Sequence, residues 1–314
     1  MPFSRKDTLE RRTADLTPSL EQEDAEQVVD GLAATPPDDA RRDSAWAALG
    51  RAERTALIGT ALVVLVALVG PALSPYSAII PSGTPLLPPG SSGHLLGTDV
   101  LGMDLGARLL AGMQRSLGAA LVVTFVAAAL GSFIGVVAGF FGGLLDTVLM
   151  RVTDLFLAFP ATIIAMALAA ALGQSIGSAI VGITVVWWPL YARLVRGEVR
   201  RVAALPHVLA ARVSGVRGWR LLGRHVVPAV TPTIAVTASL DIGAVVMTLA
   251  ALSFIGLGTP APAPELGRMA SDGMKYFLNA WWVSVLPSLA IGLLAFLFNY
   301  AGDALRAALR RTGV

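Results

Sequence analysis

The chain has 314 residues, of which 55% are hydrophobic and 14% charged, and its mean hydropathy is +0.69. In an ordinary soluble domain about a quarter of the residues are charged, so this composition excludes that class and indicates a membrane protein. The sequence contains no cysteine, which excludes disulfides and thiolate metal sites. The formal net charge of +3 is small, but the charges are unevenly distributed along the chain.

Residues 1–54 differ in composition from the rest of the chain. They are rich in Asp, Glu, Arg, Thr and Pro and contain few large apolar residues. Such a segment cannot bury enough apolar surface to fold alone, so we expect a mostly disordered cytoplasmic tail. No apolar core with a small-residue cleavage site follows its basic start, and we therefore expect no signal peptide. Residues 55–314 are predicted to form the transmembrane domain.

The transmembrane domain contains six apolar stretches that approach the roughly 20 residues needed to cross a hydrocarbon core. They cover residues 56–73, 117–141, 155–172, 176–194, 229–252 and 283–300. The third and fourth stretches are separated by three residues only, which predicts a tight hairpin. The predicted fold class is all-α, a polytopic membrane protein with six transmembrane helices.

An extracytoplasmic loop is predicted over residues 73–116. Its first part is rich in Pro, Gly and Ser. In residues 94–117, Leu101, Leu105, Leu109 and Met113 recur at helical spacing, which predicts an amphipathic helix. This helix either lies on the outer membrane surface or packs under neighbouring loops, and the sequence favours neither alternative.

The arginines indicate how the chain is oriented. Eight arginines but a single acid, Glu198, lie between Arg193 and Arg224, and further arginines follow the last stretch. Positive charge is retained in the cytoplasm, so we expect both termini and the loop at residues 195–228 on the cytoplasmic side of a bacterial plasma membrane. Nucleic-acid binding is the alternative explanation. The arginines directly flank apolar stretches, which favours orientation in the membrane and predicts no nucleic-acid partner.

The predicted cytoplasmic loop contains the strongest candidate site, in the sequence HVLAARVSGVRGWRLLGRHVVP at residues 207–228. Two adjacent alanines give a helix a shallow face, and the following glycine suits a left-handed helix end. A compact helix of this kind can enter a groove on another protein, so we predict a docking site for a separate ATPase. The predicted docking residues are Leu209, Ala210, Ala211, Arg212, Gly215, Arg217, His225 and Pro228.

An ordinary interfacial helix, held to anionic lipid by its arginines, is the alternative for this loop. Attraction to lipid requires charge. It does not require two alanines at a fixed distance from a glycine and a proline, and the spacing therefore favours docking.

Three charged residues are candidates for the pathway or its gate. Arg151 and Asp154 lie three residues apart on one predicted helix face, where they can pair. A structural pair at the membrane boundary is favoured over a gate. Asp241 lies near the centre of the fifth stretch and could face a water-filled pathway and meet the amino group of a peptide. Alternatively, Thr237 one turn earlier and a neighbouring helix satisfy its carboxylate.

Small and rigid residues are expected to shape the backbone in several places. Gly139, Gly142 and Gly143 are predicted to form a tight turn. Pro160 follows the start of the third stretch, and two further prolines, Pro189 and Pro287, lie in the fourth and sixth. Each can kink a helix, either in a gated cavity or in a passive bundle.

Four blocks of the sequence resemble one known family. They are HLLGTDVLGMD, GVVAGFFGGLLDTVLMRVTDLFLAFP, LDIGAVVMTLAALSFIGLG and FNYAGDALRAAL. In this order, over about residues 94–310, they resemble the peptide/nickel permeases of ABC importers, and more narrowly the C-type subunit of dipeptide and oligopeptide importers. The resemblance implies a fold like that of type I importer permeases and a subunit that forms half of the pathway for di- or oligopeptides.

The resemblance also implies the partners. These are a homologous second permease subunit, two ABC ATPase subunits, an extracytoplasmic substrate-binding protein and the surrounding membrane lipid. The chain contains no GxxxxGK[ST] phosphate loop. ATP and Mg are therefore expected on the ATPase subunits, and the chain itself is expected to be non-catalytic, with no bound cofactor and no metal site.

The sequence departs from the family pattern at three places. Leu209 stands where a Glu usually precedes the two alanines, Leu249 replaces a common Glu in the fifth stretch, and Glu265-Leu266 replaces a Ser-Trp pair. These departures leave the substrate open. Nickel chelates, glutathione or a sugar-like solute remain alternatives for the same machinery. An ion-coupled transporter acting alone and a membrane-embedded enzyme are disfavoured, because intramembrane charge is scarce and no catalytic constellation is present.

Overall fold

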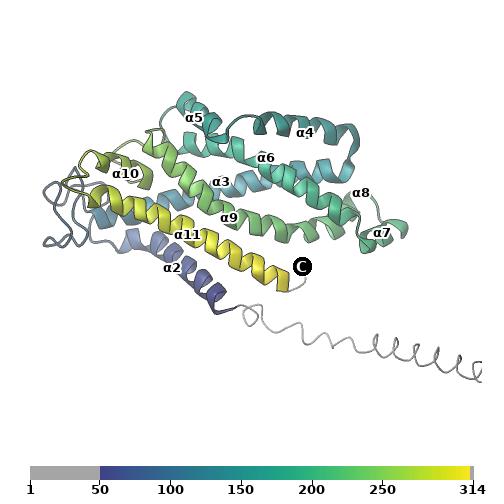
Figure 1. The fold of residues 1–314 in the computed structure, drawn as a ribbon, viewed down its shortest axis with the longest axis horizontal. Coiled ribbons are helices and arrows are strands. Elements are labelled where there is room, and N and C mark those ends of the chain that lie inside the picture. The colour runs from purple at the N-terminus through teal and green to yellow at the C-terminus, as the bar shows by residue number, and fades with distance from the viewer. Residues whose placement is uncertain (1–49, 312–314) are drawn as a thin grey trace, which may run out of the picture. The chain divides into compact units, whose positions relative to one another are not determined.

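The computed structural model describes residues 50–311, with side chains to residue 309 (Figure 1). Almost all of the predicted tail lies outside the described residues. Its last residues do not belong to a tail, because the first helix begins at Arg51, with Gly50 as its N-cap. Glu53 bonds back to the Gly50 N–H at 2.7 Å, which satisfies one of the free donors at the helix start.

The described residues form helices, joined by turns and by a loop that contains two isolated β-bridges. In chain order the helices are α2 (Arg51–Leu73), α3 (Leu105–Phe141), α4 (Gly143–Leu157), α5 (Ala161–Leu172), α6 (Ile176–Ala203), α7 (Pro206–Val213), α8 (Gly218–Leu221), the π-helical turn η2 (Leu222–Val226), α9 (Val227–Phe254), α10 (Leu266–Met274) and α11 (Trp282–Arg311).

The long helices of the described residues lie side by side in a bundle (Figure 1). Helix α9 packs between α11 and the α3–α6 pair, α2 packs on α11, and α4 and α5 lie along α6. Helix α10 and the loop at residues 74–104 gather at one end of the bundle, whereas α7 and α8 lie at the opposite end. We call these the α10 end and the α7 end.

Among residues 50–311, five helical segments are long and apolar enough to cross a membrane, and the α4–α5 pair supplies a sixth if it counts as one span. The all-α, six-span prediction is thereby confirmed as a fold class. The predicted third span is not one straight helix, because α4 and α5 are bent by 83°. Pro160 lies at the break, where its ring and missing N–H prevent the helix from continuing.

The predicted separate helix at residues 94–117 is wrong. Helix α3 begins at Leu105 and continues as one helix for 37 residues, so the loop after α2 is shorter than residues 73–116. Asp104 caps the helix start, because its carboxylate accepts the Ala107 N–H at 2.8 Å. Leu105, Leu109 and Met113 are buried, as a helix packed under loops requires, whereas Leu101 is exposed.

Glycines bring the backbones of α3 and α6 into contact. A Cβ added at Gly131, Gly135 or Gly139 would lie only 2.3, 2.5 or 2.8 Å from a carbonyl oxygen of α6. These three glycines recur every four residues, so they share one face of α3. Gly139 therefore belongs to this contact, and its predicted place in the turn is wrong. Gly142 and Gly143 do form the turn, with φ of +66° and +61°.

Candidate functional site: the α7 end and the buried charges

Helix α7 is seated on the bundle by one buried side chain. Val208 is fully buried in an apolar cluster that also contains Val199 and Val202 of α6, together with Leu221 and Val226. A two-residue turn connects α6 to α7, and Pro206 occupies the first turn of α7, where its missing N–H is not needed. The short connection and the buried valine fix α7 against the end of α6.

The outward side of α7 is apolar and shallow. Val213 is 90% exposed and Leu209 44% exposed, and Ala210 beside them is also exposed. Residues 209 and 213 are four apart, so they lie on one helix face. Exposed apolar side chains on a helix that is itself anchored from behind are typical of a protein contact surface. We call Leu209, Ala210 and Val213 the docking face.

The predicted left-handed end of α7 is confirmed. Gly215 has φ of +88°, its N–H donates to the Arg212 carbonyl, and the Val216 N–H donates to the Ala211 carbonyl. This is the Schellman pattern, which satisfies the last helical carbonyls and turns the chain sharply. Ala211 itself is half-buried and packs against the Val208 cluster, so it faces inward more than the prediction assumed.

His225 and Pro228, the last two predicted docking residues, do not lie on α7. Because α6 continues to Ala203 and a helical segment resumes at Gly218, the loop is much shorter than residues 195–228. His225 is half-buried in the π-helical turn, and Pro228 lies in the first turn of α9. Trp219 is exposed, and its ring contacts the Phe141 ring edge-on, with 5.1 Å between the ring centroids. This contact joins α8 to the end of α3.

Exposed arginines lie on α7 and on the segment that follows it, up to the π-helical turn. Arg212 and Arg217 are exposed, as are Arg220 and Arg224, and none of the four forms an ion pair within residues 50–309. The arginines at the end of α6 differ, since Arg193, Arg196, Arg200 and Arg201 each pair with an acid.

The expected Arg151–Asp154 pair is wrong. Asp154 pairs with Arg193 of α6 at 2.5 Å, and both side chains are at least half exposed. Arg151 is exposed and has no ion pair among the described residues. Helix α4 packs along α6, which brings the carboxylate to Arg193, an arrangement that spacing within one helix cannot predict.

Asp241 is half-buried on α9 and faces α6. Its carboxylate interacts with the Tyr191 hydroxyl and the Trp187 indole, although neither polar atom reaches the distance and angle of a hydrogen bond. Thr237 donates to the Thr233 carbonyl and not to Asp241, so the expected partner one turn earlier is wrong. The neighbouring helix α6 supplies the polar surroundings that an intramembrane carboxylate requires.

Sequence reasoning missed a buried carboxylate near the α7 end. Asp146, in the first turn of α4, is 5% exposed. It accepts two bonds from Arg196, at 2.5 and 2.9 Å, and one from Arg200 at 2.5 Å. The signal available was the spacing of Arg193, Arg196 and Arg200, which places all three on one face of α6, but nothing local identified their partners.

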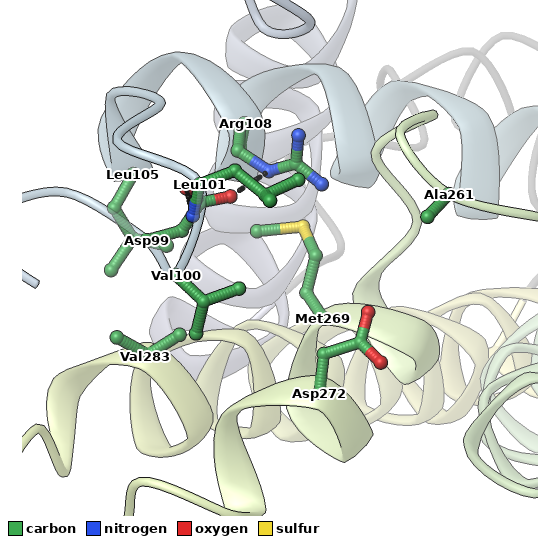
Figure 2. A pocket seen from close by; sticks show the side chains of 9 residues that line it. All are labelled: Asp99, Val100, Leu101, Leu105, Arg108, Ala261, Met269, Asp272 and Val283. Atoms are coloured by element: carbon green, nitrogen blue, oxygen red, sulfur yellow. Dashed lines mark hydrogen bonds and ion pairs between the residues drawn. The ribbon is translucent and has the colours of Figure 1, made fainter. Parts of the chain in front are cut away.

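A second buried ion pair lies at the α10 end. The Arg108 Nε lies 3.0 Å from the Asp99 carboxylate, and Figure 2 shows this pair beside Met269 and Asp272 of α10. The Arg108 guanidinium also donates to the carbonyls of Ala78 and Pro262, both at 3.0 Å. The adjoining cavity of about 30 Å³ has room for a water molecule but not for a substrate.

Glu265, which stands where the resemblance predicted a Ser, is fully buried at the start of α10. Burial raises the pKa of its carboxyl, while the nearby Ser253 hydroxyl and hydrogen bonds from the Arg268 and Gly267 N–H groups and from Ser116 oppose that rise. The carboxylate caps α10 and joins it to α3. Leu249, another of the three departures, is buried in the main apolar cluster.

The fold agrees with comparisons to known proteins. Residues 131–312 match the family model of the binding-protein-dependent transport system inner membrane component. A chain in a structure of the inward-facing MetNI methionine ABC transporter shares the fold, with a TM-score of 0.52 and 22% identity over 64% of this chain and 96% of that chain.

Curated relatives are more similar in sequence. The probable D,D-dipeptide transport system permease protein DdpC of Escherichia coli K12 is 42% identical, covering 70% of this chain and 74% of the relative. The glutathione transport system permease protein GsiD of Pectobacterium atrosepticum is 38% identical over 70% and 73%. The nickel transport system permease protein NikC of E. coli K12 is 38% identical over 81% and 91%. The chain belongs to the family of inner membrane components of binding-protein-dependent transport systems, the permeases of ABC importers.

Proposed function

We propose that this chain forms one half of the transmembrane pathway of an ATP-driven importer of di- and oligopeptides. The observation that carries the proposal is helix α7, an anchored helix whose outward face is apolar and shallow, and which is followed by exposed arginines that form no ion pair among the described residues. Such a face has no role within the described residues and suits a groove on another protein. Two ATPase subunits that bind ATP and Mg would dock there, and a homologous permease would supply the second half of the pathway.

The orientation follows from the same surface. The arginines of the α7 end favour a cytoplasmic location for this end and, with six spans, for both chain termini. The α10 end then faces outward, where an extracytoplasmic binding protein would deliver the substrate. Closure of the ATPases on ATP would displace α7 and shift the bundle between outward-open and inward-open states.

Peptides are the favoured substrate because a relative with 42% identity is named for D,D-dipeptide transport. Asp241 supports this choice, since a carboxylate within a span can pair with the amino group of a peptide. Glutathione and nickel chelates remain the second candidates, because relatives with 38% identity are named for them.

Co-purification and transport together test the proposal. Expressed with the products of neighbouring genes, the chain should co-elute with an ATPase pair, and proteoliposomes should accumulate a labelled dipeptide only when all subunits are present. Accumulation by the chain alone would refute a pump subunit. If the complete transporter takes up a nickel chelate or glutathione but no dipeptide, that solute and not a peptide is the substrate.

Asp241 provides a sharper test of the substrate. Asp241→Asn keeps a polar group of the same shape, so we expect the assembled transporter to persist with weaker uptake of peptides that have a free amino terminus. Equal uptake by Asp241→Asn and Asp241→Leu would exclude a role for the carboxylate.

A further inference from the structure

The Asp146 carboxylate lies where the end of α3, the start of α4 and the end of α6 meet. It lies one turn after the Gly142–Gly143 turn that ends α3, and it holds Arg196 and Arg200 of α6. These arginines lie in the last two turns of α6, directly before α7. We call Asp146, Arg196 and Arg200 the clasp.

The three side chains of the clasp are buried to different extents. The Asp146 side chain is 8% exposed, whereas those of Arg196 and Arg200 are 28% and 48% exposed. A buried carboxylate is costly unless it is paired, and here two cations and a helix N-terminus compensate it. If α4 separated from α6, the carboxylate would lose both partners at once. The clasp therefore favours states in which the start of α4 stays on α6.

The backbone beneath the clasp is also fixed. Gly139 of α3 packs against the Arg196 carbonyl, so the helix that carries the arginines rests on α3 without intervening side chains. At its other end α4 is joined to α6 by the exposed Asp154–Arg193 pair, and then the chain bends by 83° into α5. Helix α4 is thus attached along α6 up to the bend.

We propose that the clasp makes the start of α4 move as one body with α6 and α7, so that ATPase motion reaches the bent α4–α5 segment. This inference rests on the proposed function, and Asp146, Arg196 and Arg200 are positioning residues within it. Displacing α7 displaces the end of α6 through the two-residue turn and Val208. The clasp carries that displacement to α4, and the break at Pro160 lets α4 move without rotating α5 rigidly.

The test uses the complete transporter with its ATPases and binding protein. Asp146→Asn keeps the shape but removes the charge, so we expect the maximal rate of dipeptide uptake to fall by about tenfold or more while ATP hydrolysis continues. Asp146→Glu should restore most of the uptake. Glu198→Gln is the matched control, because it removes an ion pair that lies within α6 and does not reach α4.

A second measurement separates coupling from simple stability. The natural chain contains no cysteine, so spin labels can be placed at Leu144→Cys on α4 and Leu190→Cys on α6, both exposed positions. In the parent, the distance between the labels should stay the same when ATP and vanadate trap the ATPases. In Asp146→Asn, the mean distance between the labels should change on trapping, or the distribution of distances should become broader.

Each outcome has a clear meaning. Coupled uptake in Asp146→Asn, or a parent distance that changes on trapping, would overturn the clasp. Loss of the assembled complex in Asp146→Asn without rescue by Asp146→Glu would show that the pair is needed for folding and would overturn its role in coupling. If no ATPase binds even the parent, the proposed function fails, which is a distinguishable result.

Discussion

Arg108 at the α10 end and the four arginines at residues 212–224 of the α7 end have opposite surroundings. At the α10 end, Arg108 is buried and bonds to Asp99 and to two carbonyls from loops distant in sequence. At the α7 end, Arg212, Arg217, Arg220 and Arg224 are exposed and form no ion pair within the described residues. The first arrangement is complete within one chain and stabilises its loops. The second suits a partner, so the comparison separates residues needed for the fold from residues available for binding.

The largest effect is expected at the α10 end. Arg108→Ala leaves Asp99 buried without its cation and two carbonyls without a donor, which should cost about 3–5 kcal/mol of folding free energy. The amount of protein in the membrane and the melting temperature in detergent would show it. Arg115→Ala, an exposed position on the same helix, is the control and should melt like the parent. An unchanged melting temperature in Arg108→Ala would show that the pair is not structural.

An intermediate effect is expected on the docking face. Ala210→Trp places a large side chain in a close contact, which should cost about 1–3 kcal/mol of binding free energy. ATPase binding should then weaken by about tenfold or more, while the membrane fold stays intact. Ala211→Trp is the contrasting variant. Because Ala211 packs inward, it should lower the stability of the isolated chain as well. ATPase co-elution and melting temperature distinguish the two, and tight binding by Ala210→Trp would argue against this face.

Smaller effects are expected from Arg212 and Arg217. Exposed charges contribute about 0.2–1 kcal/mol each, so Arg212→Gln or Arg217→Gln should weaken ATPase binding slightly and make it less dependent on salt. The binding constant at low and high ionic strength is the measurement. If these variants instead disappear from the membrane while binding per molecule is unchanged, the arginines serve orientation and not docking.

The smallest effect concerns Glu265. Burial raises the pKa of its carboxyl, so the folded state holds the proton more tightly than the unfolded state does. Stability should therefore fall as pH rises from the ordinary pKa of a glutamate through the raised one. Glu265→Gln cannot ionise, and its melting temperature should vary less over that range. Parallel curves for parent and variant would contradict this.

Local signals predicted part of the site correctly. The six apolar stretches followed from composition, and the left-handed end of α7 followed from Gly215, because a Schellman end depends on a few neighbouring residues. Pairings between helices could not be predicted in this way. Asp146 and Asp154 pair with arginines of α6 because the Gly142–Gly143 turn folds α4 back along that helix, and spacing within one helix does not show this.

The bend at Pro160 also constrains how the chain enters the membrane during synthesis. Helix α5 has 12 residues and so extends for about 18 Å, well short of a hydrocarbon core of about 30 Å. Such a segment is too short to insert as an independent span. The turn at Gly173 joins it to the 28 residues of α6, which are long enough. Helix α5 is therefore expected to enter the bilayer together with α6, as the first arm of a hairpin, after α6 has left the ribosome.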